Sequence, residues 1–332
     1  MLDFSEQIPE FYRQLINWQD VDHCPLAKML VASDKEQRIV AGENADPIGD
    51  HVNEVLPGLI HRYPHKVLLV LNQTCAGHCR FCFRRASDFT HQETKLDLAA
   101  LAAYLKAHPE VDEFILSGGD PLLVETKKWQ ALKKVLLATS TIKTVRWHSR
   151  LPVFNPLALT PKRADDFFAL SGKKIILVIH INHPQEISLA FTDLIKNLKK
   201  KFPELILKSQ SVLLAGVNDT PTVLQQLCSR LKEIGIQPYR LYHLDQAPGI
   251  SHFRVSVADG LALMQKLAQL LPSTSLPEYY LDLPVGRGKV PVASLQKTAT
   301  PHQYLATNHL GEKVLYFDLT SKKVNVTLEE QN

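Results

Sequence analysis

The sequence predicts an α/β fold in which parallel strands alternate with helices. Six short runs rich in Val, Ile and Leu are separated by stretches with helical apolar spacing. From the second run onward the interval is about 30 residues, the length of one βα unit. The expected strands are 66–72, 113–116, 143–147, 174–179, 204–207 and 238–242, and the expected helices are 96–107, 126–138, 160–170, 185–199 and 222–234.

Six such units favour a partial (β/α)6 barrel, because nearly continuous apolar strands suit a parallel sheet covered by helices. Residues 61–290 are expected to form this barrel. Residues 1–60 lack the alternation and are predicted to be a helical N-terminal extension. Residues 291–332 form a short C-terminal tail with an expected hairpin of 313–317 and 323–326.

The composition is typical of a globular protein that works inside the cell. Of 332 residues, 45% are hydrophobic, yet no apolar run approaches the roughly 20 residues of a membrane span. The net charge of +4 is dispersed, so no nucleic-acid groove is expected. Five cysteines, an odd number, and a polar N-terminus argue against a secreted disulfide framework. We expect a cytoplasmic location.

Polar residues cluster at the carboxyl end of each of five expected strands. Parallel barrels build their active sites at this end. A single histidine there is more often structural, but five clusters at equivalent positions favour a site. The clusters are 117–120, 148–150, 180–183, 209–211 and 243–245.

Three cysteines, Cys75, Cys79 and Cys82, follow the first expected strand in a CxxxCxxC pattern. Clusters held wholly by protein normally use four cysteines, so three leave one iron of a four-iron cluster open to another ligand. Zinc is the alternative, and it would need a fourth ligand such as His78 or Cys24.

A second chemical feature is the segment 282–291. Gly286 and Gly288 bracket Arg287 and precede Lys289, and backbone N–H groups of such a turn can bind a phosphate. The Walker spacing is absent, so this is no P-loop. Taken alone, the segment also fits a surface loop.

Together these features resemble the lysine 2,3-aminomutase family, which combines a radical S-adenosylmethionine (SAM) cluster with pyridoxal phosphate (PLP). The resemblance covers about 46–291. Further matching motifs are 57–64, 84–85, 117–122, 180–184, 209–214, 218–219 and 239–253.

The resemblance implies three cofactors: a 4Fe-4S cluster on the three cysteines, SAM on its open iron, and PLP. By motif, Lys289 is the catalytic residue that carries PLP. Other expected PLP contacts are Arg62, Tyr242 and Arg287. The positions where the family holds SAM are Gly118, Gly119, Asp120, His180 and Gln210.

The resemblance also implies the substrate. Arg84 matches the residue that grips the substrate carboxylate, a role that suits a planar guanidinium. Asp245 and Asp282 match the carboxylates that bind the ε-ammonium of lysine. Taken singly, Asp245 could be a helix cap and Asp282 a loop residue. The implied reaction is the conversion of L-lysine to (R)-β-lysine by a SAM-derived 5'-deoxyadenosyl radical.

The chain departs from the longer clostridial-type members in ways that shape further expectations. Thr220 stands where those enzymes carry a zinc-binding cysteine, so no structural zinc is expected and the associated tetramer becomes doubtful, which leaves a homodimer open. Val285 and Arg287 replace glycines. The short form resembles bacterial members that supply β-lysine, through a separate ligase, to elongation factor P. A flavodoxin or ferredoxin is the usual electron donor.

Two alternatives stay open at this stage. One is a radical SAM enzyme that acts on another amino acid or serves another pathway. The other is a non-catalytic metal-binding scaffold, which would bind no cofactor pair and form no product.

Overall fold

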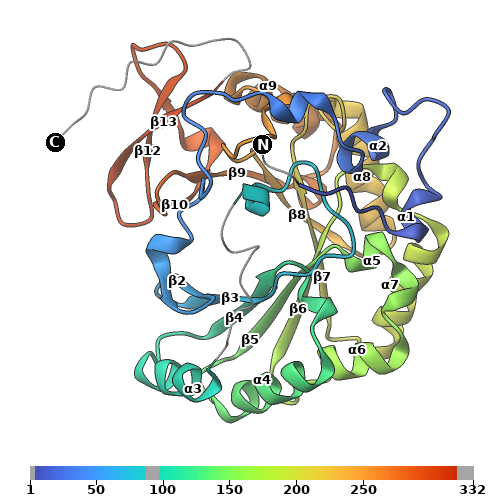
Figure 1. The fold of residues 1–332 in the computed structure, drawn as a ribbon, viewed down its shortest axis with the longest axis vertical. Helices are drawn as coiled ribbons and strands as arrows, with labels where there is room; N and C mark the ends of the chain where they lie inside the picture. The colour runs from blue at the N-terminus through green and yellow to red at the C-terminus, as the bar shows by residue number, and fades with distance from the viewer. Residues whose placement is uncertain (1–3, 87–96, 320–332) are drawn as a thin grey trace.

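The computed structural model describes residues 4–86 and 97–319, which form a mixed α/β structure around a ten-stranded sheet in the order β1 to β10 (Figure 1). Strands β3 to β9 pair in parallel. Strands β1 and β2 extend one edge and β10 the other, all antiparallel. The bounds are β1 Glu54–Leu56, β2 Leu59–Tyr63, β3 Lys66–Asn72, β4 Glu113–Gly118, β5 Thr144–Ser149, β6 Lys174–His180, β7 Ile206–Val212, β8 Gln237–Tyr242, β9 Glu278–Leu283 and β10 Gly288–Pro291.

Helices cover the outer face of this curved sheet (Figure 1). Helices α3, α6, α7, α8 and α9 each begin at a side-chain cap. Thr160 and Thr220 each precede a proline and accept a hydrogen bond from the first helical turn. The helices are α1 Glu10–Arg13, α2 Pro25–Leu30, α3 Leu98–Ala107, α4 Thr126–Ala138, α5 Leu151–Phe154, α6 Pro161–Phe168, α7 Leu189–Lys201, α8 Pro221–Glu233 and α9 Val257–Leu270.

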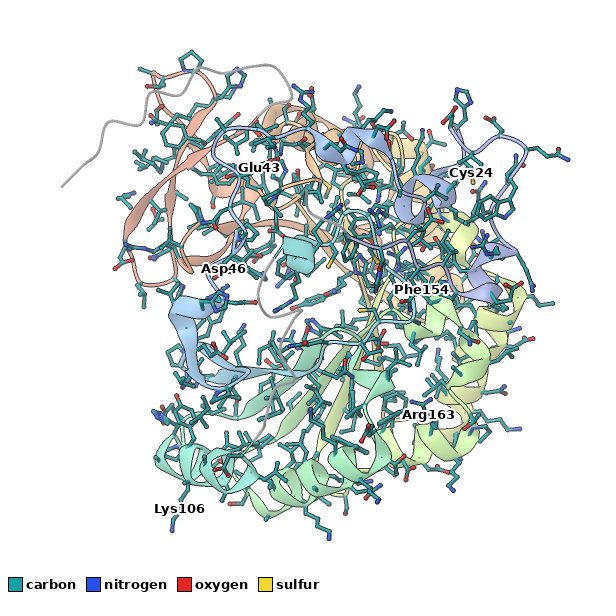
Figure 2. The ribbon with its side chains drawn as sticks, in the orientation of Figure 1. Cys24, Glu43, Asp46, Lys106, Phe154 and Arg163 are labelled. Carbon is teal, nitrogen blue, oxygen red and sulfur yellow. The ribbon has the colours of Figure 1, made fainter. Side chains whose placement is uncertain are left out.

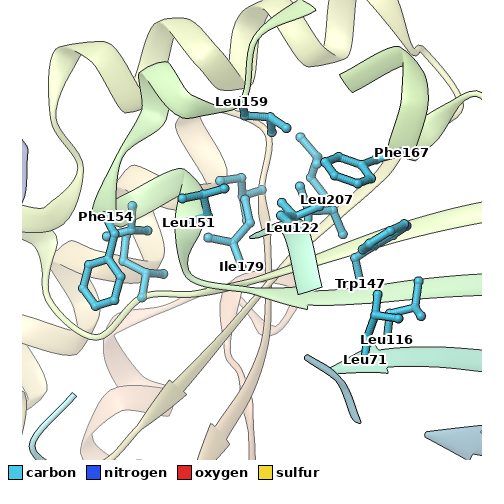
Figure 3. Packing of buried hydrophobic residues seen from close by; sticks show 14 of the residues in the cluster. Leu71, Leu116, Leu122, Trp147, Leu151, Phe154, Leu159, Phe167, Ile179 and Leu207 are labelled. Carbon is cyan, nitrogen blue, oxygen red and sulfur yellow. The ribbon is translucent and has the colours of Figure 1, made fainter. Parts of the chain in front are cut away.

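The main core lies between the sheet and these helices. Trp147 of β5 packs edge-on against Trp129 of α4, with ring centroids 4.7 Å apart. Figure 3 shows Trp147 beside Phe167 of α6, and the centroids of these two rings are 5.0 Å apart. Figure 2 shows Lys106 pointing outward from α3, whereas Phe154 lies in the interior. Because side chains alternate across a strand, the neighbours of Trp147, namely Arg146 and His148, must face the opposite side of the sheet.

The six predicted strands and the five predicted helices all form, with ends that differ by a few residues. The sequence pattern missed β9, the seventh parallel strand, and helix α9 before it. In β9 the polar Tyr280 and Asp282 interrupt the apolar run, because every second residue faces the inner side of the sheet.

The N-terminal residues form only short helical turns before the sheet begins at Glu54, within the predicted extension. Beyond β10, a second sheet contains β11 Gln296–Lys297, β12 Gln303–Thr307 and β13 Lys313–Phe317. Strand β13 pairs with β12. The second arm of the predicted hairpin, 323–326, lies outside the described residues. Among the helices of the described chain, none has the length and apolar character to cross a membrane.

Candidate active site

The candidate active site is built on the inner face of the sheet, opposite the helices. Leu281 and Leu283 of β9 belong to a hydrophobic core, so Asp282 between them faces inward. Asp282 is paired in register with Lys289 of β10. Tyr242 of β8 is paired with Tyr280 of β9 and brings its ring to the same face.

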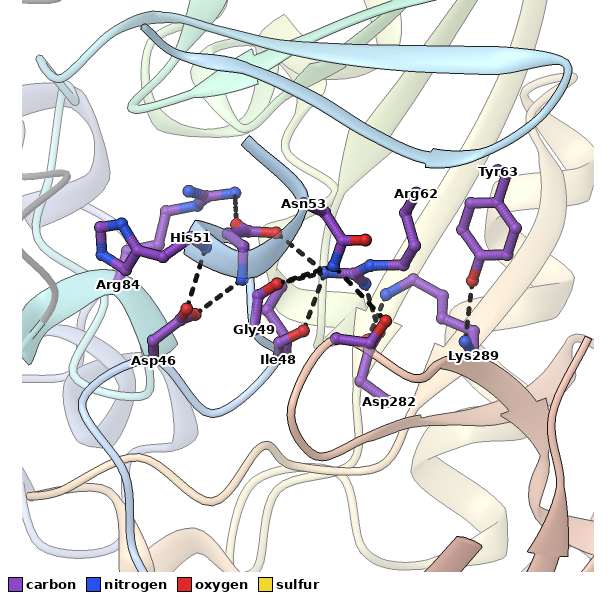
Figure 4. Close-up of polar contacts among 12 residues, drawn as sticks. Asp46, Ile48, Gly49, His51, Asn53, Arg62, Tyr63, Arg84, Asp282 and Lys289 are labelled. Carbon is purple, nitrogen blue, oxygen red and sulfur yellow. Dashed lines mark hydrogen bonds and ion pairs between the residues drawn. The ribbon is translucent and has the colours of Figure 1, made fainter. Parts of the chain in front are cut away.

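Lys289 and Asp282 form an ion pair at the centre of the site (Figure 4). The Lys289 ammonium also lies over the Tyr242 ring, 5.1 Å from its centroid. Burial alone would lower the pKa of Lys289, but Asp282, then Tyr242 and Asp245, outweigh it and raise the pKa. The backbone N–H of Lys289 donates to Tyr63 Oη at 2.8 Å, which fixes the start of β10.

Arg62 and Arg84 are joined by one carboxylate, that of Asp50 (Figure 4). Arg62 Nη2 lies 3.1 Å from Asp50 Oδ1, and Arg84 Nη2 lies 2.7 Å from Asp50 Oδ2. Arg62 also reaches Asp282 at 3.4 Å and the carbonyl of Ile48 at 2.8 Å. The two predicted anion-binding arginines and the Lys289–Asp282 pair therefore form one continuous chain of charges.

Asp245 completes the acidic side of the site. Burial, and then the neighbouring charge of Asp282, raises the pKa of Asp245 to about 7. Asp245 and Asp282 both line the same small pocket beyond β8 and β9. The two carboxylates are therefore near enough to influence each other, and their role as an ammonium-binding pair stays a prediction.

The three cysteines lie in one half-buried loop after β3. Burial raises the pKa of all three thiols, to about 11 for Cys82, and neighbouring thiols add to the rise at Cys75 and Cys82. Arg150 Nη1 donates to Cys79 Sγ at 2.8 Å, and His78 turns its Nδ1 to the carbonyl of Ser5 at 2.9 Å. Sulfur donors of this kind suit iron or iron–sulfur, which binds them as thiolates and releases their protons.

The predicted SAM contacts divide into two groups. His180 and Gln210 are register partners on the inner face, and burial, followed by the Arg150 charge, lowers the pKa of His180 to about 3. Within the described residues, His180 Nε2 is buried without a hydrogen-bond partner, so this neutral imidazole can still bind a polar ligand.

The second group lies at the end of β4, packed against the cysteine loop and the segment after β5. It contains Gly118, Gly119 and Asp120. A Cβ at Gly118 would lie 2.4 Å from the Asn72 carbonyl oxygen, and one at Gly119 would lie 2.5 Å from that of Thr74. The Asp120 carboxylate accepts hydrogen bonds from the backbone N–H groups of Arg150, Leu151 and Leu122 and from the Ser149 hydroxyl. Only glycine fits where the end of β4 meets this loop.

Arg287 has its ion-pair partner outside the predicted site residues. Its side chain is about half exposed and forms an ion pair with Glu312 at 2.7 Å. The preceding Val285 has a φ of 56°, a left-handed conformation that a β-branched residue rarely adopts. Of the two residues that replace glycines of the longer family members, Val285 therefore has an unfavourable backbone conformation, and Arg287 forms an ion pair at the surface.

Sequence reasoning missed Asp50 and Arg150 as parts of the site. Asp50 was interpreted only as part of the N-terminal extension, and Arg150 only as one member of a polar cluster. The signal that could have found Asp50 is an acidic residue shortly before a segment that supplies two arginines. Arg150 carries no such signal, because only the tertiary structure brings it to Cys79.

Comparisons with known proteins agree with this geometry. A family model described as a 4Fe-4S single cluster domain matches residues 64–150. The L-lysine 2,3-aminomutase of Escherichia coli is 35% identical over 81% of this chain and 78% of its own length. The chain belongs to the L-lysine 2,3-aminomutase family. A putative L-lysine 2,3-aminomutase of Treponema pallidum is 35% identical over 90% of this chain and 84% of its own length. For the Clostridium subterminale enzyme the identity is 32%, over 86% of this chain and 68% of its own length.

Members of the L-lysine 2,3-aminomutase family are isomerases of the radical SAM type. The part of this family member that matches the cluster model contains all three cysteines of the loop after β3. It also contains β3 and β4, the two strands whose ends enclose that loop.

The central role of Asp50 gives a stability prediction. Changing Asp50→Asn should lower the free energy of unfolding of the cofactor-free protein by about 3 kcal/mol, because it leaves two buried guanidinium groups without their shared anion. Glu312→Gln is the matched control, since its ion pair has the same 2.7 Å length as Asp50–Arg84 but is exposed. Denaturant titration measures both. Equal, small losses in the two variants would contradict the role of Asp50.

Proposed function

We propose that this chain is an L-lysine 2,3-aminomutase that converts L-lysine to (R)-β-lysine. The observation that carries the proposal is the inner-face cluster in which Lys289, Asp282 and Asp245 adjoin Arg62 and, through Asp50, Arg84. An amino acid with a carboxylate at one end and an ammonium at the other matches this distribution of charge. The names of the relatives support the same substrate.

The residues present fit a 4Fe-4S cluster, SAM and PLP. Cys75, Cys79 and Cys82 would hold the cluster, and Lys289 would hold PLP. When bound, these groups supply a radical initiator and an electron-delocalising ring, which is chemistry that side chains alone do not provide. The Arg62 Nε atom is buried and has no partner within the described residues, so a further anionic oxygen can bind there. His180 Nε2 supports a polar contact near the cluster in the same way.

The protein's own residues bind and orient the substrate. Arg84 would hold the carboxylate of lysine, and Asp245 with Asp282 would hold its ε-ammonium, which fixes the chain of the substrate between them. In the cofactor-free protein Asp282 keeps Lys289 protonated, and with PLP on Lys289 the same carboxylate would be available to the ε-ammonium of the substrate. Fixing the reacting carbons in this way matters, since a displacement of about 1 Å can cost roughly a hundredfold in rate.

Further parts of the proposal rest on the resemblance. We interpret the curved sheet as the partial (β/α)6 barrel of the radical SAM type. The product would serve β-lysylation of elongation factor P through a separate ligase, and a flavodoxin or ferredoxin would supply the electron. Such a cluster needs reduced thiols, which supports a cytoplasmic location.

The cysteines give a direct prediction. Changing any one of Cys75, Cys79 or Cys82 to serine should reduce bound iron and acid-labile sulfide several-fold, because a cluster with three protein ligands loses one of them. Cys228→Ser is the control, as Cys228 is a buried thiol in a different core, near α8 and α9. Iron and sulfide analysis of anaerobically purified protein measures the effect. Full iron content in all three variants would rule out this ligand set.

Substrate choice tests the function itself. Reconstituted protein is incubated without air with SAM, PLP and dithionite, and with either L-lysine or L-glutamate. We expect a β-amino acid from lysine alone, because Asp245 and Asp282 would repel the side-chain carboxylate of glutamate. Product from glutamate but not from lysine would favour the alternative, an aminomutase for another amino acid.

A further inference from the structure

A buried chain of hydrogen bonds connects the N-terminal segment to one of the three cysteines. Tyr12 of α1 donates its hydroxyl to Glu186 Oε1 at 2.8 Å. Arg150, after β5, donates Nη2 to the same oxygen at 2.6 Å and Nη1 to Cys79 Sγ at 2.8 Å. The side chains of Tyr12 and Glu186 are fully buried, and Arg150 is 6% exposed.

Both ends of Arg150 are held in place. Its backbone N–H donates to Asp120 Oδ2 at 2.8 Å. Glu186, the partner of its guanidinium, is itself fixed because Oε2 accepts the backbone N–H groups of Asn182 at 2.6 Å and His183 at 2.9 Å. The guanidinium therefore has little freedom to turn away from Cys79.

The surroundings of Arg150 strengthen its interaction with sulfur. Its guanidinium carbon lies 4.5 Å from the Phe154 ring centroid and 5.2 Å from that of Phe81. Aromatic rings exclude water, and a hydrogen bond between charged groups is stronger where the local dielectric constant is low.

We propose that Arg150 raises the reduction potential of the iron–sulfur cluster through its hydrogen bond to Cys79, and that Glu186 and Tyr12 are positioning residues that hold it there. Hydrogen bonds to the sulfurs are among the determinants of cluster potentials. A donor that withdraws electron density from a cysteine thiolate stabilises the reduced cluster, which carries one more electron. The inference rests on the cluster of the proposed function and adds how the chain tunes it.

The test is an anaerobic redox titration of the reconstituted full-length protein, followed by the electron paramagnetic resonance signal of the reduced cluster. Arg150→Gln should shift the midpoint to more negative potential. At a fixed potential, the ratio of reduced to oxidised cluster should fall about tenfold, which equals about 59 mV for a one-electron couple. Arg150→Lys keeps the charge but cannot reach Cys79 and Glu186 together, so we expect a smaller shift of the same sign. Tyr12→Phe removes only the hydroxyl and should give the smallest shift.

Arg254→Gln is the matched control. Arg254 is also a buried guanidinium in an ion pair, with Glu43 at 3.1 Å, and their side chains are 1% and 2% exposed. No contact joins it to the described cysteines, so its loss should destabilise the fold without moving the midpoint.

Wild-type midpoints in Arg150→Gln, Arg150→Lys and Tyr12→Phe, with full iron and sulfide content, would overturn the inference. If Arg150→Gln fails to fold or to bind iron, Arg150→Lys and Tyr12→Phe decide it, and unshifted midpoints in both overturn it. A wild-type protein that binds no iron and sulfide would overturn the cluster of the proposed function, and this inference with it.

Discussion

Replacing Lys289 with arginine should abolish β-lysine formation while leaving the protein folded. Arginine keeps a positive charge opposite the buried Asp282, so the ion pair survives. It cannot take the covalent role of a lysine amine toward PLP, because a guanidinium stays protonated in proteins. We expect the rate to fall by at least about a hundredfold, the lower bound for losing a positioned group that takes part in the chemistry.

Two measurements separate this chemical role from a structural one. The first is the melting temperature, which should stay near that of the wild type in Lys289→Arg and fall in Lys289→Ala, where Asp282 loses a buried partner. The second is PLP trapped on the protein by borohydride and detected by mass spectrometry, which should occur in the wild type only. A Lys289→Arg protein that still carries trapped PLP, or still forms product, would refute the role of Lys289.

Lysine affinity should rise with pH through about 7, because of Asp245. Burial, and then Asp282, raises the pKa of this carboxyl to about 7, so it is protonated in much of the free protein below that pH. Lysine needs the carboxylate, and binding at lower pH must therefore release a proton. The dissociation constant should increase by about tenfold for each pH unit below 7, by linkage.

The pH dependence of folding stability has the opposite sign to the pH dependence of lysine affinity. A carboxyl with a raised pKa contributes stability that is fully present below about pH 4, the pKa of an unfolded aspartate, and is lost as the pH rises through about 7. Lysine binding and the stability of the free protein should thus change in opposite directions across this range.

Asp245→Asn provides the matching variant. It should weaken lysine binding at pH 8 by about 1.5–3 kcal/mol, the contribution of a hydrogen bond to a charged group, and remove the pH dependence that Asp245 causes. Equilibrium dialysis with labelled lysine between pH 6 and 8 measures both effects. The same pH profile in wild type and variant would show that Asp245 does not bind the ammonium.

The sequence predicted the parts of the fold and site that depend on local pattern. The apolar runs of β3 to β8 and the helical spacing of α4 could be recognised because each periodicity lies within one element. The cysteine spacing indicated a cluster loop for the same reason. The CxxxCxxC motif keeps the three thiols in one loop, and the pairing of β9 with β10 places Asp282 opposite Lys289.

The parts of the fold and site that were not predicted depend mainly on contacts between segments distant in the sequence. Asp50 reaches Arg84 from 34 positions earlier in the chain, and Arg150 reaches Cys79 from 71 positions later. A single sequence shows neither contact. Gly118 and Gly119 allow close approach of two backbone segments, and Arg287 pairs with Glu312 at the surface, neither of which the sequence shows. The SAM and PLP contacts expected of these residues stay predictions. Strand β9 was not predicted, because its inward-facing polar residues interrupt the apolar run by which buried strands are recognised.

The aminomutase activity is tested most directly by measuring β-lysine and 5'-deoxyadenosine together, by chromatography, after anaerobic incubation with L-lysine, SAM, PLP and dithionite. An aminomutase that returns the hydrogen to its initiator regenerates SAM, so we expect many β-lysine molecules for each 5'-deoxyadenosine released. Accumulation of 5'-deoxyadenosine with lysine unchanged would show that the cluster cleaves SAM but that the Lys289 site does not rearrange lysine, and would rule out the proposed aminomutase activity.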